Sequence, residues 1–365
     1  SLAAAQRQSH PMALLFIDGF DHYDPQALDP AGDPWLARGK ATVLSQYAER
    51  IPGRRPSSYA LRLPEGSGGG YVKTFDSGRG SLIVGAAIRV APYDPASAAP
   101  VLLGVLDATT AVRHVVSVTP DGRVQVLDED DTVLAVSETT VPARGWHYIE
   151  VQVTQGTTDG SIDVRCNGAL AIHLPVQDTL RGGGLLKSVF VGAVPGQPCP
   201  VTVDVDDLYI ADTSGTINNT CLGDVRVDVL TPTADGSLND WIADPPTVPR
   251  WQAVADTDEA TAVQSSASGD QQTFVLSALP VMTTPAIHGV QVVALARKTD
   301  AGAASIQGVM HRNGGTVTGA ASVLQTQLAW HTALFEADVT GTQWTEATLA
   351  SEATLAMTEF GVAQA

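Results

Sequence analysis

Carboxylate side chains are the residues of this sequence whose types and spacing could do chemistry. Asp204, Asp206 and Asp207 lie close together in the middle of the chain, and Asp18 and Asp21 lie near its start. Carboxylate oxygens are the ligands that calcium prefers in proteins. These five aspartates could therefore hold a structural calcium ion if their two segments pair as strands. We otherwise expect no cofactor, and calcium remains the alternative.

A second acidic run, DEDD at residues 128–131, directly follows a predicted strand and is most simply a solvated turn. Phosphate-binding loops, nucleophile elbows, HExxH and paired CxxC motifs are missing from the sequence. The glycine-rich GSGGG at 66–70 lacks a lysine and a strand–turn–helix setting, so we interpret it as a loop. The sequence therefore predicts no catalytic residue, no cofactor-binding residue and no assigned metal ligand.

The three cysteines, Cys166, Cys199 and Cys221, do not have the spacing of metal ligands. We expect free thiols, because a chain folded in a reducing cytosol rarely forms disulfides. A Cys199–Cys221 disulfide remains an open alternative.

Composition limits the partners. The net charge is −18 over 365 residues. Such a chain repels nucleic acid phosphates and anionic membranes, so we expect neither as a partner. No apolar run has the length needed to insert in a membrane. The opening SLAAAQRQSH lacks the apolar core of a signal peptide, which predicts synthesis in the cytoplasm without one.

The stretch at residues 201–212 organises the predicted elements. Val201, Val203 and Val205 alternate with polar residues, and the apolar positions then change parity at Leu208. A strand that changes parity contains an extra residue, so we predict a bulge at 206–207. The residues that follow are small and polar, which is typical of a linker.

Many short alternating segments with abundant Gly and Pro predict an all-β protein of two β-sandwich domains in tandem. We divide the chain into an N-terminal arm (1–13), a first domain (14–212), a linker (213–222) and a second domain (223–365). In the second domain we predict a strand at 224–230 and a long loop at 231–272. A short helix is predicted at 41–51.

Two hairpins have predictable registers. The turn Pro120-Asp121-Gly122 pairs Val118 with Val124 and Val116 with Val126. Near Asn167-Gly168, a two-residue turn would pair Arg165 with Leu170. A three-residue loop would instead pair Val164 with Leu170 and Ile162 with Ile172, and we predict this second register because it buries one consistent face.

Residues 14–212 resemble the concanavalin A-like lectin/glucanase jelly roll. FIDGFDHY, GWHYIEVQV, GSIDVRCNGALAI and VDVDDLYIAD carry the resemblance. It implies that the first and last strands lie side by side. The β-glucanase members place their carboxylates with an E-x-D-x-x-E strand. Here Glu129-Asp130-Asp131 is followed by Leu134 where the second glutamate belongs, so no activity is carried over.

The second half is similar to a segment of tailed-bacteriophage structural proteins. CLGDVRVDVLTPTADGSLNDW, Trp251, Trp344 and EFGV carry this similarity. It implies a non-enzymatic virion protein of the tail tip, baseplate, fibre or capsid decoration. Its expected partners are other virion proteins and further copies of itself, and its expected location is the virion, made in the bacterial host cytoplasm. Trp241, Trp251 and Trp344 are then candidate subunit contacts, unless each simply fills a core.

Carbohydrate binding is the alternative function. A lectin-like adhesin for host-surface glycans would need exposed aromatic residues on a sheet, and Tyr148 is predicted to point outward. A glycoside hydrolase with rearranged carboxylates is a more remote alternative.

Overall fold

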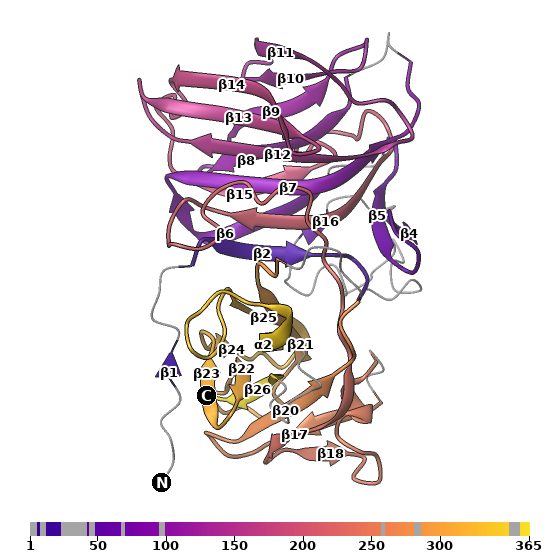
Figure 1. Ribbon diagram of the computed structural model, residues 1–365, viewed down its shortest axis with the longest axis vertical. Helices are drawn as coiled ribbons and strands as arrows, with labels where there is room; N and C mark the ends of the chain where they lie inside the picture. The colour runs from indigo at the N-terminus through magenta and orange to yellow at the C-terminus, as the bar shows by residue number, and fades with distance from the viewer. Residues whose placement is uncertain are drawn as a thin grey trace. The chain divides into compact units, whose positions relative to one another are not determined.

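The computed structural model describes residues 6–7, 12–22, 42–43, 48–66, 70–94, 99–256, 260–280, 286–349 and 358–365. These residues are almost entirely β-structure, and the chain divides into two compact units (Figure 1). One unit is Ala13–Asp228, and the other is Ser1–Met12 together with Val229–Ala365. The predicted all-β class with two β-sandwiches is confirmed.

The first unit is an antiparallel sandwich of the jelly-roll type, made of two sheets that we call sheet I and sheet II. Sheet I has the order β14-β13-β12-β7-β16-β5-β4, with β2 also paired to β16, and sheet II has the order β11-β10-β9-β8-β15-β6-β3. The strands of sheet I are β2 (Leu14–Asp18), β4 (Glu49–Pro52), β5 (Tyr59–Leu63), β7 (Ser81–Val90), β12 (Trp146–Thr154), β13 (Gly160–Cys166), β14 (Ala169–Gln177) and β16 (Val203–Ala211). Those of sheet II are β3 (Thr42–Val43), β6 (Tyr71–Arg79), β8 (Val101–Asp107), β9 (Val112–Val118), β10 (Arg123–Leu127), β11 (Val133–Thr140) and β15 (Leu186–Val191).

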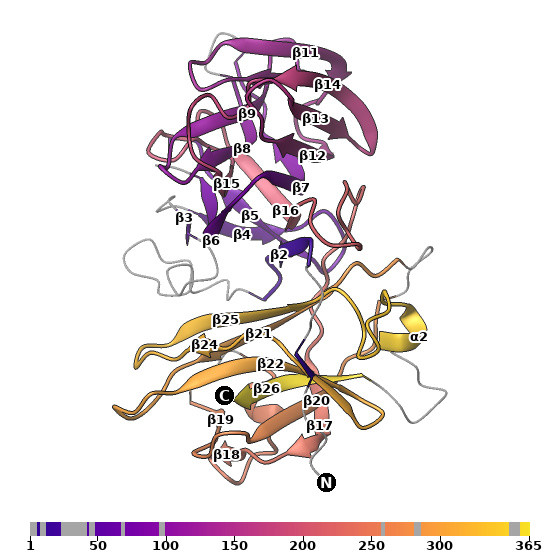
Figure 2. The same cartoon turned by 90° about the vertical axis from the view of Figure 1, so that its left-hand side faces the viewer.

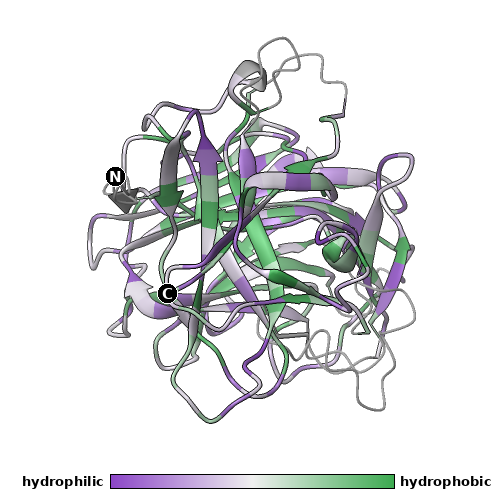
Figure 3. Ribbon diagram, turned by 90° about the horizontal axis from the view of Figure 1, so that it is seen from below, coloured by the Kyte–Doolittle hydropathy of each residue, from purple (hydrophilic) through white to green (hydrophobic). Residues whose placement is uncertain are grey.

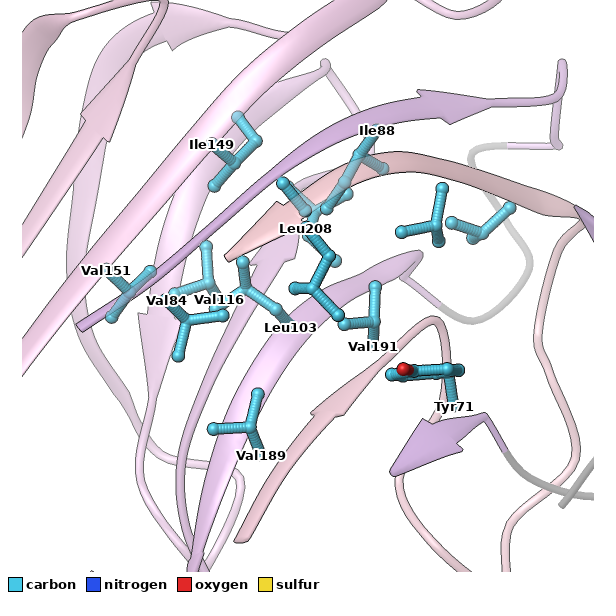
Figure 4. Close-up of a cluster of buried hydrophobic side chains, with 14 of the residues drawn as sticks. Tyr71, Val84, Ile88, Leu103, Val116, Ile149, Val151, Val189, Val191 and Leu208 are labelled. Carbon is cyan, nitrogen blue, oxygen red and sulfur yellow. The ribbon is translucent and has the colours of Figure 1, made fainter. Parts of the chain in front are cut away.

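The core of this unit lies between the two sheets. Each strand sends alternate residues inward, since successive side chains point to opposite faces. Figure 4 shows this packing, with side chains such as Val84, Ile149 and Leu208 from sheet I meeting Leu103 and Val189 from sheet II. Coloured by hydropathy, single strands change between hydrophobic and hydrophilic residues along their length (Figure 3).

The strands near the two ends of this unit pair with each other. β2 lies antiparallel to β16, with Leu208 opposite Asp18. The predicted bulge is also confirmed. The register of β16 on β7 shifts between Asp206 and Tyr209, and Asp207 has a φ of 50°. The extra residue lets Val205 and Leu208 both enter the core although their parity differs.

The second unit also has two layers. Its larger sheet has the order β1-β23-β22-β26-β20-β17, with β24 beside β22, and β21 and β25 form the layer that packs on it (Figure 2). β18 and β19 form a small hairpin. The elements are β1 (Gln6–Arg7), β17 (Pro232–Asn239), β18 (Ile242–Asp244), the 3₁₀ turn η1 (Gln252–Val254), β19 (Ala262–Gln264), β20 (Gln271–Leu276), β21 (Val290–Ala296), β22 (Ser305–Arg312), β23 (Gly315–Thr318), β24 (Ser322–Val323), β25 (Ala329–Phe335), α2 (Glu346–Leu349) and β26 (Glu359–Gln364).

Several local predictions were wrong. The segment 41–51 contains parts of β3 and β4 where a helix was predicted, and its residues 44–47 lie outside the described residues. The predicted strand at 224–230 is irregular, and the predicted loop at 231–272 contains β17, β18, η1 and β19. The described residues contain no helix long and apolar enough to cross a membrane.

Candidate functional site

A row of charged and aromatic side chains crosses the outer face of sheet I. The strand registers place Glu49, Arg62, Asp204, Arg89 and Trp146 opposite one another, on β4, β5, β16, β7 and β12. Residues beside these in the strands, such as Leu61, Val205 and Ile88, belong to the core. The row therefore lies on the face that points away from the core.

Asp204 holds the row together. Its carboxylate accepts hydrogen bonds from Nε (2.7 Å) and Nη2 (3.2 Å) of Arg62 and from Nε (2.8 Å) of Arg89. The Asp204 side chain is only 5% exposed, whereas Arg62 is 36% and Arg89 27% exposed. The hydrogen bond to Asp204 raises the pKa of Arg62 above its ordinary value, partly offset by burial. Two guanidinium groups are thus fixed in place and still reach solvent.

Trp146 forms the end of the row. The guanidinium of Arg89 lies over its ring, 4.7 Å from the ring centroid, and the indole is half-buried. This contact fixes the ring, since a cation over an aromatic face is held by the ring quadrupole. The arrangement offers an apolar ring beside rigid hydrogen-bond donors on a solvent-facing sheet.

The aspartates of the bulge have a different role. Asp207 is fully buried and accepts hydrogen bonds from Arg54 Nε (2.5 Å), Arg55 Nη1 (2.5 Å) and the Val227 amide (2.7 Å). Asp206, also buried, accepts from the Arg54 amide (3.0 Å). Burial, and then the charge of Asp207, raise the pKa of Asp206 to about 7. These carboxylates tie a loop and a later segment to the sheet.

The five aspartates do not form the calcium site that the sequence left open. The carboxylate of Asp18 accepts hydrogen bonds from the Tyr71 hydroxyl (3.0 Å) and the Phe20 amide (3.0 Å). Asp21 accepts from the Tyr59 amide (2.6 Å), and burial raises the pKa of Asp21 to about 6. Arginines and amides thus take up the oxygens that a metal would need. In the described part of the chain, no group of three or more His, Cys, Asp or Glu side chains is placed to hold a metal ion.

The acidic run at 128–131 is more than a solvated turn. Asp128 is buried and receives a hydrogen bond from Arg181 (2.8 Å), and Glu129 is contacted by both Arg113 and Arg181. Burial opposes the ionised form of Asp128, but backbone amides and the charge of Arg181 more than compensate and lower its pKa. The two arginines are distant in sequence, so the pattern of residues 128–131 alone could not reveal them.

Tyr148 is not the exposed aromatic residue that was predicted. Its side chain points to the outer face but is 1% exposed, and its hydroxyl donates to the Asp207 carbonyl (3.0 Å). Trp146 was not among the predicted site residues, although the same alternation that places Tyr148 outward also places Trp146 outward. Arg62 and Arg89 were not among them either, because neighbouring strands of a sheet cannot be identified from one sequence.

The other predicted contact residues, three tryptophans, and the three cysteines lie in different surroundings. Trp344 is buried in the core of the second unit, 2% exposed, where its Nε1 donates to the Phe335 carbonyl (2.9 Å). It therefore fills a core, as the alternative held. Trp241 and Trp251 are half-buried. All three cysteines are free, as expected.

Comparison with known proteins gives solved structures only. No protein-family model matches the chain, and no curated protein sequence matches it. Among solved structures, it is similar to the alginate lyase Aly36B in complex with alginate tetrasaccharide, with 14% identity and a TM-score of 0.40, over 57% of this chain and 100% of that one. It is also similar to domain 4 of the Geobacillus stearothermophilus arabinanase AbnA in complex with arabinotriose, with 16% identity and a TM-score of 0.35, over 56% and 96% of the two chains.

A third similar structure is the Trypanosoma rangeli sialidase in complex with sialic acid, with 18% identity and a TM-score of 0.35. This match covers 47% of the present chain and 27% of the sialidase. At these identities the comparisons concern the fold alone.

Two predictions find no counterpart among these structures. The similar structures are carbohydrate-processing proteins, and the ones named here are not virion components. The predicted bacteriophage virion function and the expectation that the chain is not an enzyme are both contradicted by these neighbours, and neither is kept. The chemistry of this chain has to be argued from its own residues.

Proposed function

We propose that the first unit recognises a carbohydrate, and that the row Arg62–Asp204–Arg89–Trp146 is its binding site. The observation that carries the proposal is the half-buried indole of Trp146, held by Arg89, together with the two guanidinium groups of Arg62 and Arg89 that the buried Asp204 carboxylate fixes. The carbohydrate-binding alternative, and not the virion function, is therefore the one retained here.

A sugar ring has an apolar face of C–H groups and an edge of hydroxyls. The indole can pack against the apolar face, because an aromatic ring buries a large area with little loss of conformational freedom. Planar guanidinium groups donate in a fixed fork to hydroxyl or carboxylate oxygens. Their positions are set before binding, since Asp204 restrains both arginines, and preorganisation lowers the entropic cost of association.

Affinity gel electrophoresis of the full chain against alginate, arabinan, xylan, mixed-linkage β-glucan and sialylated glycoprotein tests this proposal. We expect retardation by at least one of these polymers, and a dissociation constant about tenfold weaker for Trp146→Ala, equivalent to about 1.4 kcal/mol. Trp251→Ala removes another half-buried indole, one that belongs to the second unit, and is the matched control. Reducing ends and unsaturated products measured in the same samples report whether binding is accompanied by cleavage.

Binding to none of the polymers, or equal binding by Trp146→Ala and the unaltered chain, would refute the proposal.

A further inference from the structure

Two further rows of polar side chains continue the same face of sheet I. In the register, Tyr148 lies opposite Ala87, and Glu150 and Tyr209 both lie opposite Gly85. The ring of Tyr209 lies over Gly85, and its hydroxyl donates to Glu150 Oε1 at 2.6 Å. These positions adjoin the proposed binding row, because Trp146, Tyr148 and Glu150 alternate along β12.

A short segment covers Tyr209 and Glu150. We call residues 221–228 the strap. Its backbone amides donate to the sheet, from Leu222 to the Tyr209 hydroxyl (3.0 Å) and from Gly223 to Glu150 Oε1 (2.8 Å). Beneath the strap, Tyr209 is 1% exposed and Glu150 is 0% exposed. Tyr148, also 1% exposed, lies under the guanidinium of Arg54, 5.4 Å from the ring centroid, and Arg54 in turn contacts Asp224 and the Val225 carbonyl of the strap.

The strap is held by polar contacts. It has no regular secondary structure, and none of its residues belongs to the hydrophobic core of the unit. The Val227 amide also donates to the buried Asp207 carboxylate (2.7 Å), and Arg54 donates to the Val225 carbonyl. Asp224 forms an ion pair with Arg54 (2.6 Å), and Asp228 lies 3.8 Å from Arg55. Ion pairs at partly exposed positions contribute little to stability, so the strap is weakly attached over residues 221–226, and Val227 is the anchor at their end.

The covered surface is poorly suited to permanent burial. Glu150 Oε2 is buried and has no hydrogen-bond partner, although Oε1 has two. Leaving one oxygen of a buried carboxylate unsatisfied is costly, and a face that stays covered is normally apolar. The strap supplies only N–H donors to Tyr209 and Glu150, and hydroxyl groups of a sugar would donate to the same atoms.

We propose that Tyr148, Glu150 and Tyr209 form a second part of the carbohydrate-binding surface, and that the strap occupies it until further sugar units of a bound polymer displace it. This inference rests on the proposed function of the adjoining row. It identifies the ligand as a polymer of several sugar units rather than a single sugar, because the covered side chains extend the site by two rows along β12.

Two variants of the full chain loosen the strap by different means. Asp224→Asn/Asp228→Asn removes its ion pairs. Gly223→Ala leaves the charges intact but strains the strap, because Gly223 has a φ of 83° that only glycine adopts readily. Glu138→Gln is the matched control, since the Glu138 side chain is 98% exposed and its ion pair with Arg123 is long, at 4.0 Å.

We expect hydrogen exchange of the Leu222 and Gly223 amides to rise at least tenfold in both variants. Tetranitromethane should then nitrate Tyr209, while Tyr71, which is buried inside the sandwich, stays unmodified. Retention by the polymer panel should rise several-fold. The control variant should match the unaltered chain in all three measurements.

Faster exchange without stronger retention would overturn the inference, as would exchange that stays slow in both variants. If the unaltered chain still binds through Trp146 in that case, only the inference fails and the proposed function stands. Loss of binding in every protein would refute the proposed function itself.

Discussion

Gly85 makes the packing of Tyr209 on sheet I possible, and its replacement by alanine is a sharp test of this geometry. A Cβ atom at Gly85 would lie 2.1 Å from Cε1 of the Tyr209 ring. The ring cannot shift sideways without losing its hydroxyl hydrogen bond to Glu150. The alanine side chain therefore forces Tyr209 off the sheet.

The expected loss of stability has two parts. Losing a hydrogen bond to a carboxylate costs about 1.5–3 kcal/mol. Overpacking a tightly filled site costs about 1–3 kcal/mol. Together these predict that Gly85→Ala lowers the free energy of unfolding of the first unit by about 2.5–6 kcal/mol.

Native-state hydrogen exchange of the β7 and β16 amides in the full chain measures this loss, since it reports on the first unit by itself. Gly80→Ala is the matched control, because a Cβ at Gly80 meets no atom within 4 Å. In a Tyr209→Ala background the cost of Gly85→Ala should fall below about 1 kcal/mol, because the opposing ring is gone. A cost below 1 kcal/mol in the unaltered background, or an equal cost in both backgrounds, would refute the geometry.

Three further predictions concern other elements. Asp206 has a pKa of about 7 in the folded unit against 3.8 in the unfolded chain, so the folded state binds its proton more tightly. Relative to Asp206→Asn, the unaltered chain should therefore lose stability as the pH rises from 4 to 7. Urea unfolding at several pH values measures this loss, and a difference in stability that does not change with pH would contradict the prediction. Gly168→Ala should cost about 1 kcal/mol because its φ is 80°, as measured by exchange at β13, and no loss would contradict the left-handed turn. Trp344→Ala should cost about 3–5 kcal/mol in the second unit, as measured by exchange at β26, and a loss below 1 kcal/mol would argue against its burial.

Local patterns predicted the fold well wherever one turn decided the pairing. The hairpin at Pro120 has the predicted register, with Val118 opposite Val124. At Asn167-Gly168 the prediction was wrong. The turn has two residues, both with positive φ, and Cys166 lies opposite Ala169.

A bulge in the second hairpin allows both a two-residue turn and one consistent buried face, and the prediction did not consider a bulge. The register shifts between Val164 and Arg165, so Arg165 lies opposite Leu170 and Val164 lies opposite Ile172. The resulting bulge keeps Val164 and Ile172 in the core. The Asn-Gly pair, which adopts positive φ readily, fixed the turn at two residues, and the bulge kept the apolar side chains on the buried face.

The candidate site was less accessible to sequence analysis. Its residues Arg62, Arg89, Trp146 and Asp204 come from four strands, and a row forms only when the order and register of those strands are known. Alternation shows that each residue points outward, but it cannot show which of them meet. The ion pairs of Asp204 therefore depend on the order of the strands in the sheet, and no local sequence motif predicts them.

The second unit is not continuous in sequence. Its strand β1 pairs in parallel with β23, with Gln6 opposite Val317, about 300 residues apart. During synthesis the first strand emerges long before its partner exists, and the whole jelly roll is made in between. A fragment that begins at Val229 therefore lacks one strand of its own sheet and leaves the edge of β23 unpaired. An exposed strand edge is a template for pairing with other chains, so the N-terminal residues protect a domain that is encoded at the other end of the chain.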